Sequence, residues 1–342
     1  MALLSVDLGR TATKACVDRS PDGAVIVPAN VAPVGVDRVR QGGFDAGLAE
    51  PLWDIWLEYQ GEGYALGQLA ADFGADLGVG QSKVEDALVK VLACAGYYQL
   101  SGKVATVVGL PYLSQDQFDR EKAQILSLLR LPHLFNYRGQ EVAVELDPVW
   151  VVPEGYGSFV WTEACTGSAA ELLKRSVAVI DIGHQTTDLL AFDRFRFARA
   201  ASQSNNFAMD EFYSRVAKNI PGADSQSLAL IEAVNRPEGQ RRFRPRGESQ
   251  PTDLDQMLPN LRKAFAKELS QRCIEWLPER VTDAIISGGG GEFFWPDLKA
   301  LFEEAGLVVH LASPSRLANA LGQHAYAAAM LRAAKRGEEA SK

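Results

Sequence analysis

The sequence has few cysteines, no excess of basic residues and no long apolar run, and each shortage excludes a class of protein. Its four cysteines lie far apart without a CxxC pair, which argues against a zinc site and against a disulfide framework. A net charge of −8 argues against broad, non-specific binding to nucleic acid, because that binding needs a basic surface. No run approaches ~18 consecutive apolar residues, and the N-terminus lacks the basic region of a secretory signal. We therefore expect a cytoplasmic protein that does not bind membranes.

The rest of the composition is that of an ordinary folded protein. Hydrophobic residues make up 47% of the chain and charged residues 23%, values that lie away from disordered and fibrous proteins. At 342 residues the chain exceeds the usual size of a single hydrophobic core, so two domains are expected.

Two stretches, residues 3–17 and residues 177–191, share one pattern. In each, an apolar run ends in aspartate and is followed by one apolar residue, a glycine and small polar residues. The two turns read DLGRTATK at residues 7–14 and DIGHQTTD at residues 181–188. This internal repeat predicts two halves of related topology, each opening with a β-hairpin.

The residue types in these turns suit a polyphosphate and magnesium. A carboxylate at the end of a strand, as at Asp7 and Asp181, can hold a hydrated Mg²⁺ ion, which keeps several of its waters. Gly9 and Gly183 let backbone amide groups approach a phosphate without a Cβ in the way. One such turn alone is usually only a turn. Its repetition in the second half, together with a third glycine-rich stretch at residues 288–291, favours a phosphate clamp.

Apolar periodicity predicts alternating strands and helices in both halves. We expect strands at residues 3–8, 14–18, 24–27, 52–59, 103–110, 150–153, 177–182, 187–193, 195–201, 283–286 and 307–311, and an edge hairpin at 137–146. We expect helices at residues 68–73, 82–100, 115–130, 154–165, 207–219, 223–234, 255–277, 295–306 and 315–336. Ser82 and Glu85 form a predicted capping box. Residues 288–291 are expected to form a loop, and the arginine-rich stretch 236–253 a surface loop or short hairpin.

The order of these motifs resembles the actin-like ATPase superfamily, and within it the bacterial ParM/StbA plasmid-segregation proteins. The two turns resemble its phosphate loops. Three further segments fall in the expected order: PEGYG at residues 153–157 resembles the first connecting segment, IISGGG at 285–290 the adenosine loop, and ANALG at 318–322 the second connecting helix. VGLP at 108–111 resembles the ParM-type segment before the first connector.

The resemblance implies a fold class and a domain organisation. It implies an α/β, actin-like (ribonuclease H-like) duplicated fold with two domains flanking a nucleotide cleft. The first domain is expected at residues 1–165, with an inserted subdomain at about 28–80. The second is expected at residues 166–315, and a C-terminal helix at 316–342 is expected to return to the first domain.

The resemblance also implies a set of site residues. Asp7 and Asp181 would hold Mg²⁺, and Glu154 would orient the attacking water with help from Asp181. Phosphates would be held by residues of the two turns: Gly9, Arg10, Thr11, Thr13, Lys14, Gly183, His184, Gln185 and Thr186. Adenine and ribose would be admitted by Gly288, Gly289 and Gly290. Arg10, His184 and Gln185 depart from the family pattern, which bears on the phosphate contacts and the rate of hydrolysis.

The function implied by the resemblance is hydrolysis of ATP, or GTP, coupled to filament assembly, for plasmid or DNA segregation or intracellular positioning. The expected partners are further copies of the chain and a DNA-binding adaptor. A non-filament ATPase and a small-molecule kinase are alternatives, although a kinase would need a substrate-binding carboxylate and larger insertions. A heat-shock-type chaperone is disfavoured because no peptide-binding domain follows, and a membrane-tethering relative because the apolar face of the last helix is mostly alanine. The basic loop at 241–246 matches no motif and could contact nucleotide, a filament neighbour or solvent.

Overall fold

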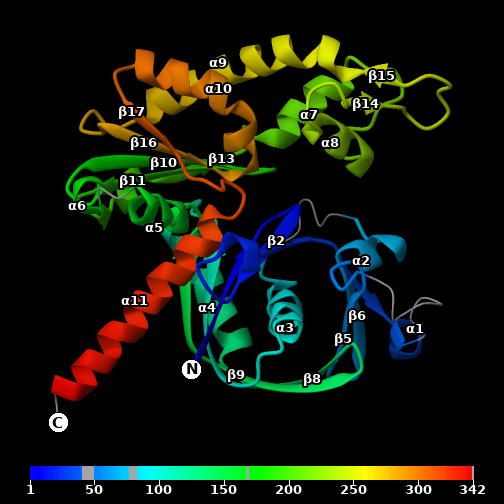
Figure 1. The fold of residues 1–342 in the computed structure, drawn as a ribbon, viewed down its shortest axis with the longest axis vertical. Helices are drawn as coiled ribbons and strands as arrows, with labels where there is room; N and C mark the ends of the chain where they lie inside the picture. Colours follow the sequence, from blue (N-terminus) through cyan, green and yellow to red (C-terminus); the bar gives the residue numbers. More distant parts are fainter. Residues whose placement is uncertain (41–49, 77–82, 167–168, 341–342) are drawn as a thin grey trace. The chain divides into compact units, whose positions relative to one another are not determined.

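The computed structural model describes residues 1–40, 50–76, 83–166 and 169–340. The chain divides into two compact units (Figure 1). Unit 1 comprises residues 1–164 and 317–342, and unit 2 comprises residues 165–316. Ser82, the first residue of the expected capping box, lies outside the described residues, as does part of the expected inserted subdomain.

Unit 1 is built on a nine-stranded sheet with the order β3-β2-β1-β7-β9-β8-β5-β6-β4. Strand β1 is antiparallel to β2 and parallel to β7, which is parallel to β9. The central strands are buried apolar runs, as expected where helices cover both faces of a parallel sheet. The strands are β1 (Ala2–Leu8), β2 (Ala12–Cys16), β3 (Val25–Pro28), β4 (Val31–Val34), β5 (Ile55–Tyr59), β6 (Glu62–Leu66), β7 (Gly102–Leu110), β8 (Pro132–Tyr137) and β9 (Gln140–Pro153).

Helices α3 and α11 cover opposite faces of β1 and β2. Side chains alternate between the faces of a strand, and Ser5 on β1 donates from Oγ to the carbonyl oxygen of Ala320 on α11 at 2.8 Å. Thr13 on β2, on the other face, lies against α3. The helices of this unit are α1 (Val36–Arg40), α2 (Gln68–Asp72), α3 (Ala87–Tyr97), α4 (Gln115–Leu129), α5 (Tyr156–Cys165) and α11 (Ala318–Ala340).

Unit 2 repeats the core of unit 1 in a smaller sheet. Its main strand order is β12-β11-β10-β16-β17, and β13 also pairs with β11. Strand β10 is antiparallel to β11 and parallel to β16, which is parallel to β17. The hairpin β1–β2 and its parallel neighbours β7 and β9 thus recur as β10–β11 with β16 and β17, which confirms the predicted repeat. The strands are β10 (Ser176–Ile182), β11 (Thr187–Asp193), β12 (Arg196–Phe197), β13 (Gln203–Asn205), β16 (Asp283–Ser287) and β17 (Val308–Leu311).

An aromatic cluster forms the core between the helices of unit 2. Phe265 stacks on Phe207 with ring centroids 4.4 Å apart and on Phe294 at 5.1 Å, while Phe212 meets Phe294 edge-on. Such pairs add to the stabilisation from burial alone. The helices are α6 (Ala169–Leu172), α7 (Met209–Ala217), α8 (Leu228–Asn235), α9 (Leu258–Trp276) and α10 (Gly288–Glu304), and a small hairpin joins β14 (Arg242–Phe243) to β15 (Thr252–Asp253). Within the described ranges no helix is long and apolar enough to cross a membrane.

Several expected elements need correction. Residues 288–291 are the first turn of α10 rather than a loop, because the buried glycines let this turn pack closely on the sheet. The hairpin expected at 137–146 is β8–β9, but it lies inside the sheet rather than at its edge, because β9 also pairs with β7. Its second strand continues through the strand expected at 150–153, since β7 pairs with β9 on both sides of Pro148 across a register shift. Of the strand expected at 195–201, only Arg196–Phe197 pairs, and residues 199–201 form a 3-10 turn. Strands β4 and β6 were not predicted.

Candidate functional site

Asp7 and Lys14 face each other across the β1–β2 hairpin. They are paired residues of the antiparallel register, so their side chains lie on the same face of the sheet. Lys14 Nζ lies 2.9 Å from Asp7 Oδ2, and the aspartate is 5% exposed. Asn319 on α11 donates from Nδ2 to Asp7 Oδ1 at 3.2 Å. The carboxylate at the end of β1 is therefore held by a cation and an amide, ready to face a charged ligand.

The turn between β1 and β2 has the form of a backbone cradle. A Cβ added to Gly9 would meet the carbonyl oxygen of Ala12 and, at 2.8 Å, Lys14 Nζ, so only glycine allows this approach. Arg10 and Thr11 are half-buried in the turn, and the Thr11 carbonyl accepts a hydrogen bond from the amide of Ala29. The sequence-predicted residues of this turn are thus brought to one place, with the exception of the Thr13 side chain.

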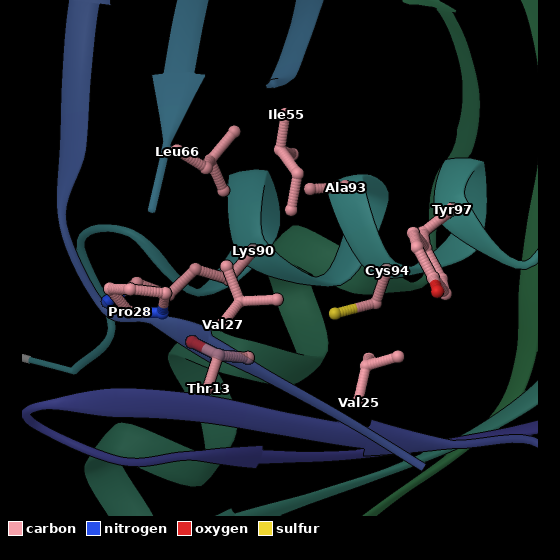
Figure 2. Close-up of a pocket in the computed structure, with 10 residues that line it drawn as sticks. All are labelled: Thr13, Val25, Val27, Pro28, Ile55, Leu66, Lys90, Ala93, Cys94 and Tyr97. Carbon is pink, nitrogen blue, oxygen red and sulfur yellow. The ribbon is translucent and has the colours of Figure 1, made fainter. Parts of the chain in front are cut away.

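Thr13 points to the other face of the sheet. Its side chain lines a small cavity together with Val25, Val27 and residues of α3 (Figure 2), and the cavity has a volume of about 20 Å³. A cavity of this size holds about one water molecule, far less than a nucleotide. The lining is mostly apolar, and its polar members include Thr13, Tyr97 and Lys90, whose pKa is lowered mainly by burial. The side chain of Thr13 therefore packs beneath the hairpin and does not join Asp7 and Lys14.

Glu154 lies directly after β9, beside the end of β7. Its amide donates to the carbonyl oxygen of Leu110 at 2.8 Å, which fixes the corner between β9 and α5. The side chain is buried and forms an ion pair with Lys83, which precedes α3 and is also buried. Burial raises the pKa of the Glu154 carboxyl, and the positive charges of Lys83 and Lys14 act in the opposite direction. Unit 1 thus contains a buried carboxyl group whose pKa is raised by burial, with two lysines partly opposing that shift.

Three polar residues of this half-site were missed by the sequence analysis. Lys83 is the partner of Glu154, Asn319 is the partner of Asp7, and Gln323 is a fully buried amide on α11. Asn319 lies inside the segment 318–322 that resembled the second connecting helix, so that motif was a signal for it. Lys83 and Gln323 carried no signal, since one lysine before an apolar helix and one glutamine within a helix are common on surfaces.

In unit 2 the turn between β10 and β11 is tied to the start of α7. Gly183 donates its amide to the carbonyl oxygen of Thr186 at 2.9 Å, which closes the turn. The carbonyl oxygens of Gly183 and His184 accept hydrogen bonds from the amides of Met209 and Asp210. Gly183, His184, Gln185 and Thr186 are half-buried, so this turn keeps one side open to a ligand.

His184 has an apolar environment in this turn. Its ring lies 5.6 Å from that of Tyr213 on α7, and Nε2 is buried without a hydrogen-bond partner among the described residues. Burial lowers the pKa of His184 to about 4. The residue that departs from the family pattern is therefore a neutral, packed histidine at neutral pH rather than an extra cation for phosphate.

The predicted residues Asp181 and Gly288 meet where β10 and α10 come together. A Cβ added to Gly288 would meet the Ile182 carbonyl oxygen and Asp181 Oδ1, and Gly288 has a φ of +80°. Gly289 lies near the Arg316 side chain, whose Cγ is 3.8 Å from where a Cβ would stand. Gly290 is buried in the same turn. Unit 2 therefore gathers Asp181, the 183–186 turn and the three glycines at one end of its sheet.

The donor sets fit a hydrated metal ion rather than a fully coordinated one. No cluster of three or more histidine, cysteine, aspartate or glutamate side chains exists within the residues that the structure describes. Asp7 and Asp181 each stand near the end of the first strand of their sheet. Mg²⁺ commonly takes one or two carboxylates and retains its waters, so each of these residues, taken by itself, would hold such an ion mainly through water.

Comparison with known proteins identifies the fold. Residues 5–157 match the family model "Actin like proteins N terminal domain". Among solved structures, the actin-like protein Alp7A gives a TM-score of 0.78 at 17% identity, covering 99% of both chains. Ta0583, an archaeal actin homologue in complex with ADP, gives 0.71 at 17% identity, covering 96% of this chain and 99% of that one. No curated protein matches.

A filament structure is among these matches. A ParM from Clostridium botulinum, solved as a 15-stranded filament, gives a TM-score of 0.68 at 18% identity, covering 95% of this chain and 98% of that one. Together these matches span both units and show the duplicated actin-like fold, which confirms the fold class and the resemblance drawn from the motifs.

Proposed function

We propose that this chain, which has the actin-like fold, binds and hydrolyses a nucleoside triphosphate in a cycle coupled to filament assembly. The observation that carries the proposal is a feature that recurs at the end of the first strand in both sheets. In both units an aspartate near the end of the first strand is followed by a glycine turn, and one glycine at each site leaves no room for a Cβ. Such turns bind anions through backbone amides.

ATP with Mg²⁺ is the proposed ligand. Lys14 and the amides of residues 9–11 would hold phosphate oxygens from unit 1, and the turn at residues 183–186 would hold them from unit 2. Mg²⁺, when bound, supplies positive charge that stabilises the phosphate oxygens, with Asp7 and Asp181 holding its waters. Gly288, Gly289 and Gly290 would admit the adenine and ribose. The archaeal actin homologue solved with ADP supports a nucleotide as ligand.

Glu154 is the proposed general base. It would accept a proton from a water molecule as the water oxygen forms a bond to the terminal phosphorus and the bond from that phosphorus to the bridging oxygen breaks. Its buried position restricts its orientation, and phosphoryl transfer depends mainly on positioning and electrostatics. Asp181 would assist from unit 2. Lys14 would stabilise the negative charge on the phosphate oxygens. The products are ADP and inorganic phosphate.

Filament assembly is the proposed output of the cycle. The filament structure of the Clostridium botulinum ParM, which shares the fold, supports this part. Head-to-tail contacts that do not close into a ring generate filaments. We propose plasmid or DNA segregation through a DNA-binding adaptor as the use of such filaments, because the net charge of −8 disfavours direct, non-specific DNA binding.

Light scattering and negative-stain microscopy test the assembly step. We expect filaments at micromolar protein with Mg-ATP or Mg-GTP and their loss with ADP or without nucleotide. Turnover without assembly would leave a non-filament ATPase, and phosphate transfer to a small molecule would favour the kinase alternative. Glu154→Gln should slow phosphate release and prolong the filaments, whereas Glu163→Gln, which changes another buried glutamate one to two turns into α5, should not.

A further inference from the structure

Two polar side chains border Glu154, and nothing in the resemblance assigned them a role. Lys83 forms a buried ion pair with the Glu154 carboxylate. Gln323 lies on α11, on the same side of the sheet as Asp7 and Asn319. We propose that both residues complete the Glu154 site: Lys83 fixes the carboxylate, and Gln323 donates a hydrogen bond to the water molecule that Glu154 activates. This inference rests on the proposed hydrolysis.

The geometry of Lys83 is that of a positioning residue. The Lys83 and Glu154 side chains are 7% and 10% exposed, so solvent does not compete for either charge. A buried carboxylate without a partner is strongly destabilising, whereas a buried pair with good geometry is tolerated. Lys83 lies in the turn that leads into α3, whereas Glu154 follows β9. The ion pair therefore holds the carboxylate from a separate element and limits its rotation.

The geometry of Gln323 points to a water molecule. Gln323 is 0% exposed, and its Nε2 has no protein partner among the described residues, although its Oε1 accepts a hydrogen bond from Ser5 at 3.4 Å. A buried donor without a partner is costly, and ordered water usually satisfies such groups. The Gln323 amide nitrogen therefore has two N–H donors that no protein group among the described residues accepts, and a water molecule can accept one of them.

Gly109 brings this donor beside Glu154. A Cβ at Gly109 would lie 2.5 Å from Gln323 Nε2 and 3.4 Å from Glu154 Cγ, so both side chains pack against the backbone of Gly109 near the end of β7. A water bound there could donate to the carboxylate and accept from the amide. Lys14 and Asp7 are the other charged groups that act on Glu154, and both belong to the phosphate turn. The arrangement places an activated water next to the residues proposed to hold phosphate.

The first test measures steady-state phosphate release with Mg-ATP. Lys83→Met and Gln323→Met should each lower kcat by about tenfold or more with little change in KM, since both act on the water rather than on nucleotide binding. Lys83→Arg, which keeps the charge, should recover most of the loss. Lys90→Met removes a partly buried lysine on α3 that is paired with Asp86, and should leave kcat unchanged. Wild-type kcat in both Met variants would overturn the proposal.

The second test uses the nucleotide-free protein and does not depend on activity. Lys83→Met should lower the unfolding temperature, and Lys83→Met with Glu154→Gln should recover it beyond the sum of the single effects, because the buried charge is then gone. Gln323→Met should change the unfolding temperature little, because the variant removes two buried N–H donors that no protein group among the described residues accepts and loses only the 3.4 Å hydrogen bond from Ser5. Additive effects of Lys83→Met and Glu154→Gln on the unfolding temperature would contradict the role of Lys83. A Gln323→Met variant that loses stability and turnover together would contradict the role of Gln323.

The two proposals fail in different ways. If Glu154→Gln keeps wild-type turnover, the proposed base is wrong. If Glu154→Gln loses turnover while Lys83→Met and Gln323→Met keep it, the base stands and only the inference about its two neighbours is wrong.

Discussion

Asn319 Nδ2 donates a hydrogen bond to Asp7 Oδ1 at 3.2 Å, joining residues that lie 312 positions apart in the chain. The Oδ1 atom of the same asparagine accepts the amides of Gly155 at 3.2 Å and Gly157 at 3.1 Å. One side chain on α11 thus links the aspartate at the end of β1 to the turn that follows Glu154. The proposed metal ligand and the proposed base are held in one network through Asn319.

Asn319→Asp tests this network. The change replaces a donor with a second carboxylate against Asp7, so we expect a loss of about 2–4 kcal/mol in the free energy of unfolding and a weaker affinity for nucleotide. Denaturant unfolding and nucleotide titration measure the two effects. Asn219→Asp, at an exposed position of unit 2, is the matched control and should change stability by less than about 0.5 kcal/mol. Equal effects of the two substitutions would contradict the network.

Lys14→Met tests the phosphate turn of unit 1. A hydrogen bond to a charged group contributes about 1.5–3 kcal/mol, so the affinity for ATP should fall about 10-fold to 100-fold. Titration with a fluorescent ATP analogue measures it. Lys103→Met, which removes an exposed lysine 2.6 Å from Asp147 on the same sheet, should leave the affinity unchanged. Unchanged affinity in Lys14→Met would remove this residue from the site.

Gly288→Ala tests the close approach of α10 to Asp181. The added Cβ would meet Asp181 Oδ1 and the Ile182 carbonyl oxygen at a φ of +80°. Gly306→Ala is a matched control, because Gly306 has a φ of +85° and open space around it. The control should cost about 1–2 kcal/mol from backbone strain alone. Gly288→Ala should cost more and should weaken nucleotide binding, and equal costs with unchanged binding would show that the contact has no role.

The pH dependence of stability tests the environment of His184. Above the ordinary pKa of 6.5 the ring is neutral in both the folded and the unfolded chain, so it adds no pH dependence. Between 6.5 and about 4 the unfolded chain binds a proton that the folded chain does not, so the free energy of unfolding falls as the pH falls. The total effect is about 3 kcal/mol, since one pKa unit corresponds to about 1.4 kcal/mol.

His184→Gln should therefore flatten the stability curve between pH 6.5 and 4, measured by denaturant unfolding of the nucleotide-free protein. Burial also lowers the pKa of His133 and His324, so part of the slope should persist. Curves of identical slope for the variant and the wild type would show that His184 is protonated as easily in the folded chain as in the unfolded chain.

Local pattern was sufficient to predict the fold class. The repeated strand–Asp–x–Gly turns and the alternation of strands with helices led to the duplicated α/β fold, because both signals are short-range and periodic. The prediction of a loop at residues 288–291 was wrong. Glycine disfavours a helix by propensity, but close packing on the sheet overrides that preference at the start of α10. The continuous strand β9 was split for a similar reason, since Pro148 signals a break, whereas pairing with β7 on both sides of Pro148 keeps the strand continuous across a register shift.

The site was only partly predictable for a different reason. Asp7, Lys14 and Asp181 lie in short motifs, so their types and spacing indicate phosphate chemistry. The partners Lys83 and Gln323 lie 71 and 169 positions from Glu154, and only the folded chain shows that a lysine and a glutamine at those distances are buried beside it. Tertiary burial, rather than any local spacing, turns these common surface residue types into candidates for a site.

Phosphate release from Mg-ATP, followed as a function of protein concentration, tests the central claim most directly. If hydrolysis is coupled to assembly, turnover per chain should be low at dilute protein, rise above a critical concentration and be lost in Glu154→Gln. Turnover per chain that is independent of concentration would contradict the coupling to filaments. Absence of phosphate release at every concentration would contradict the proposed nucleotide hydrolysis itself.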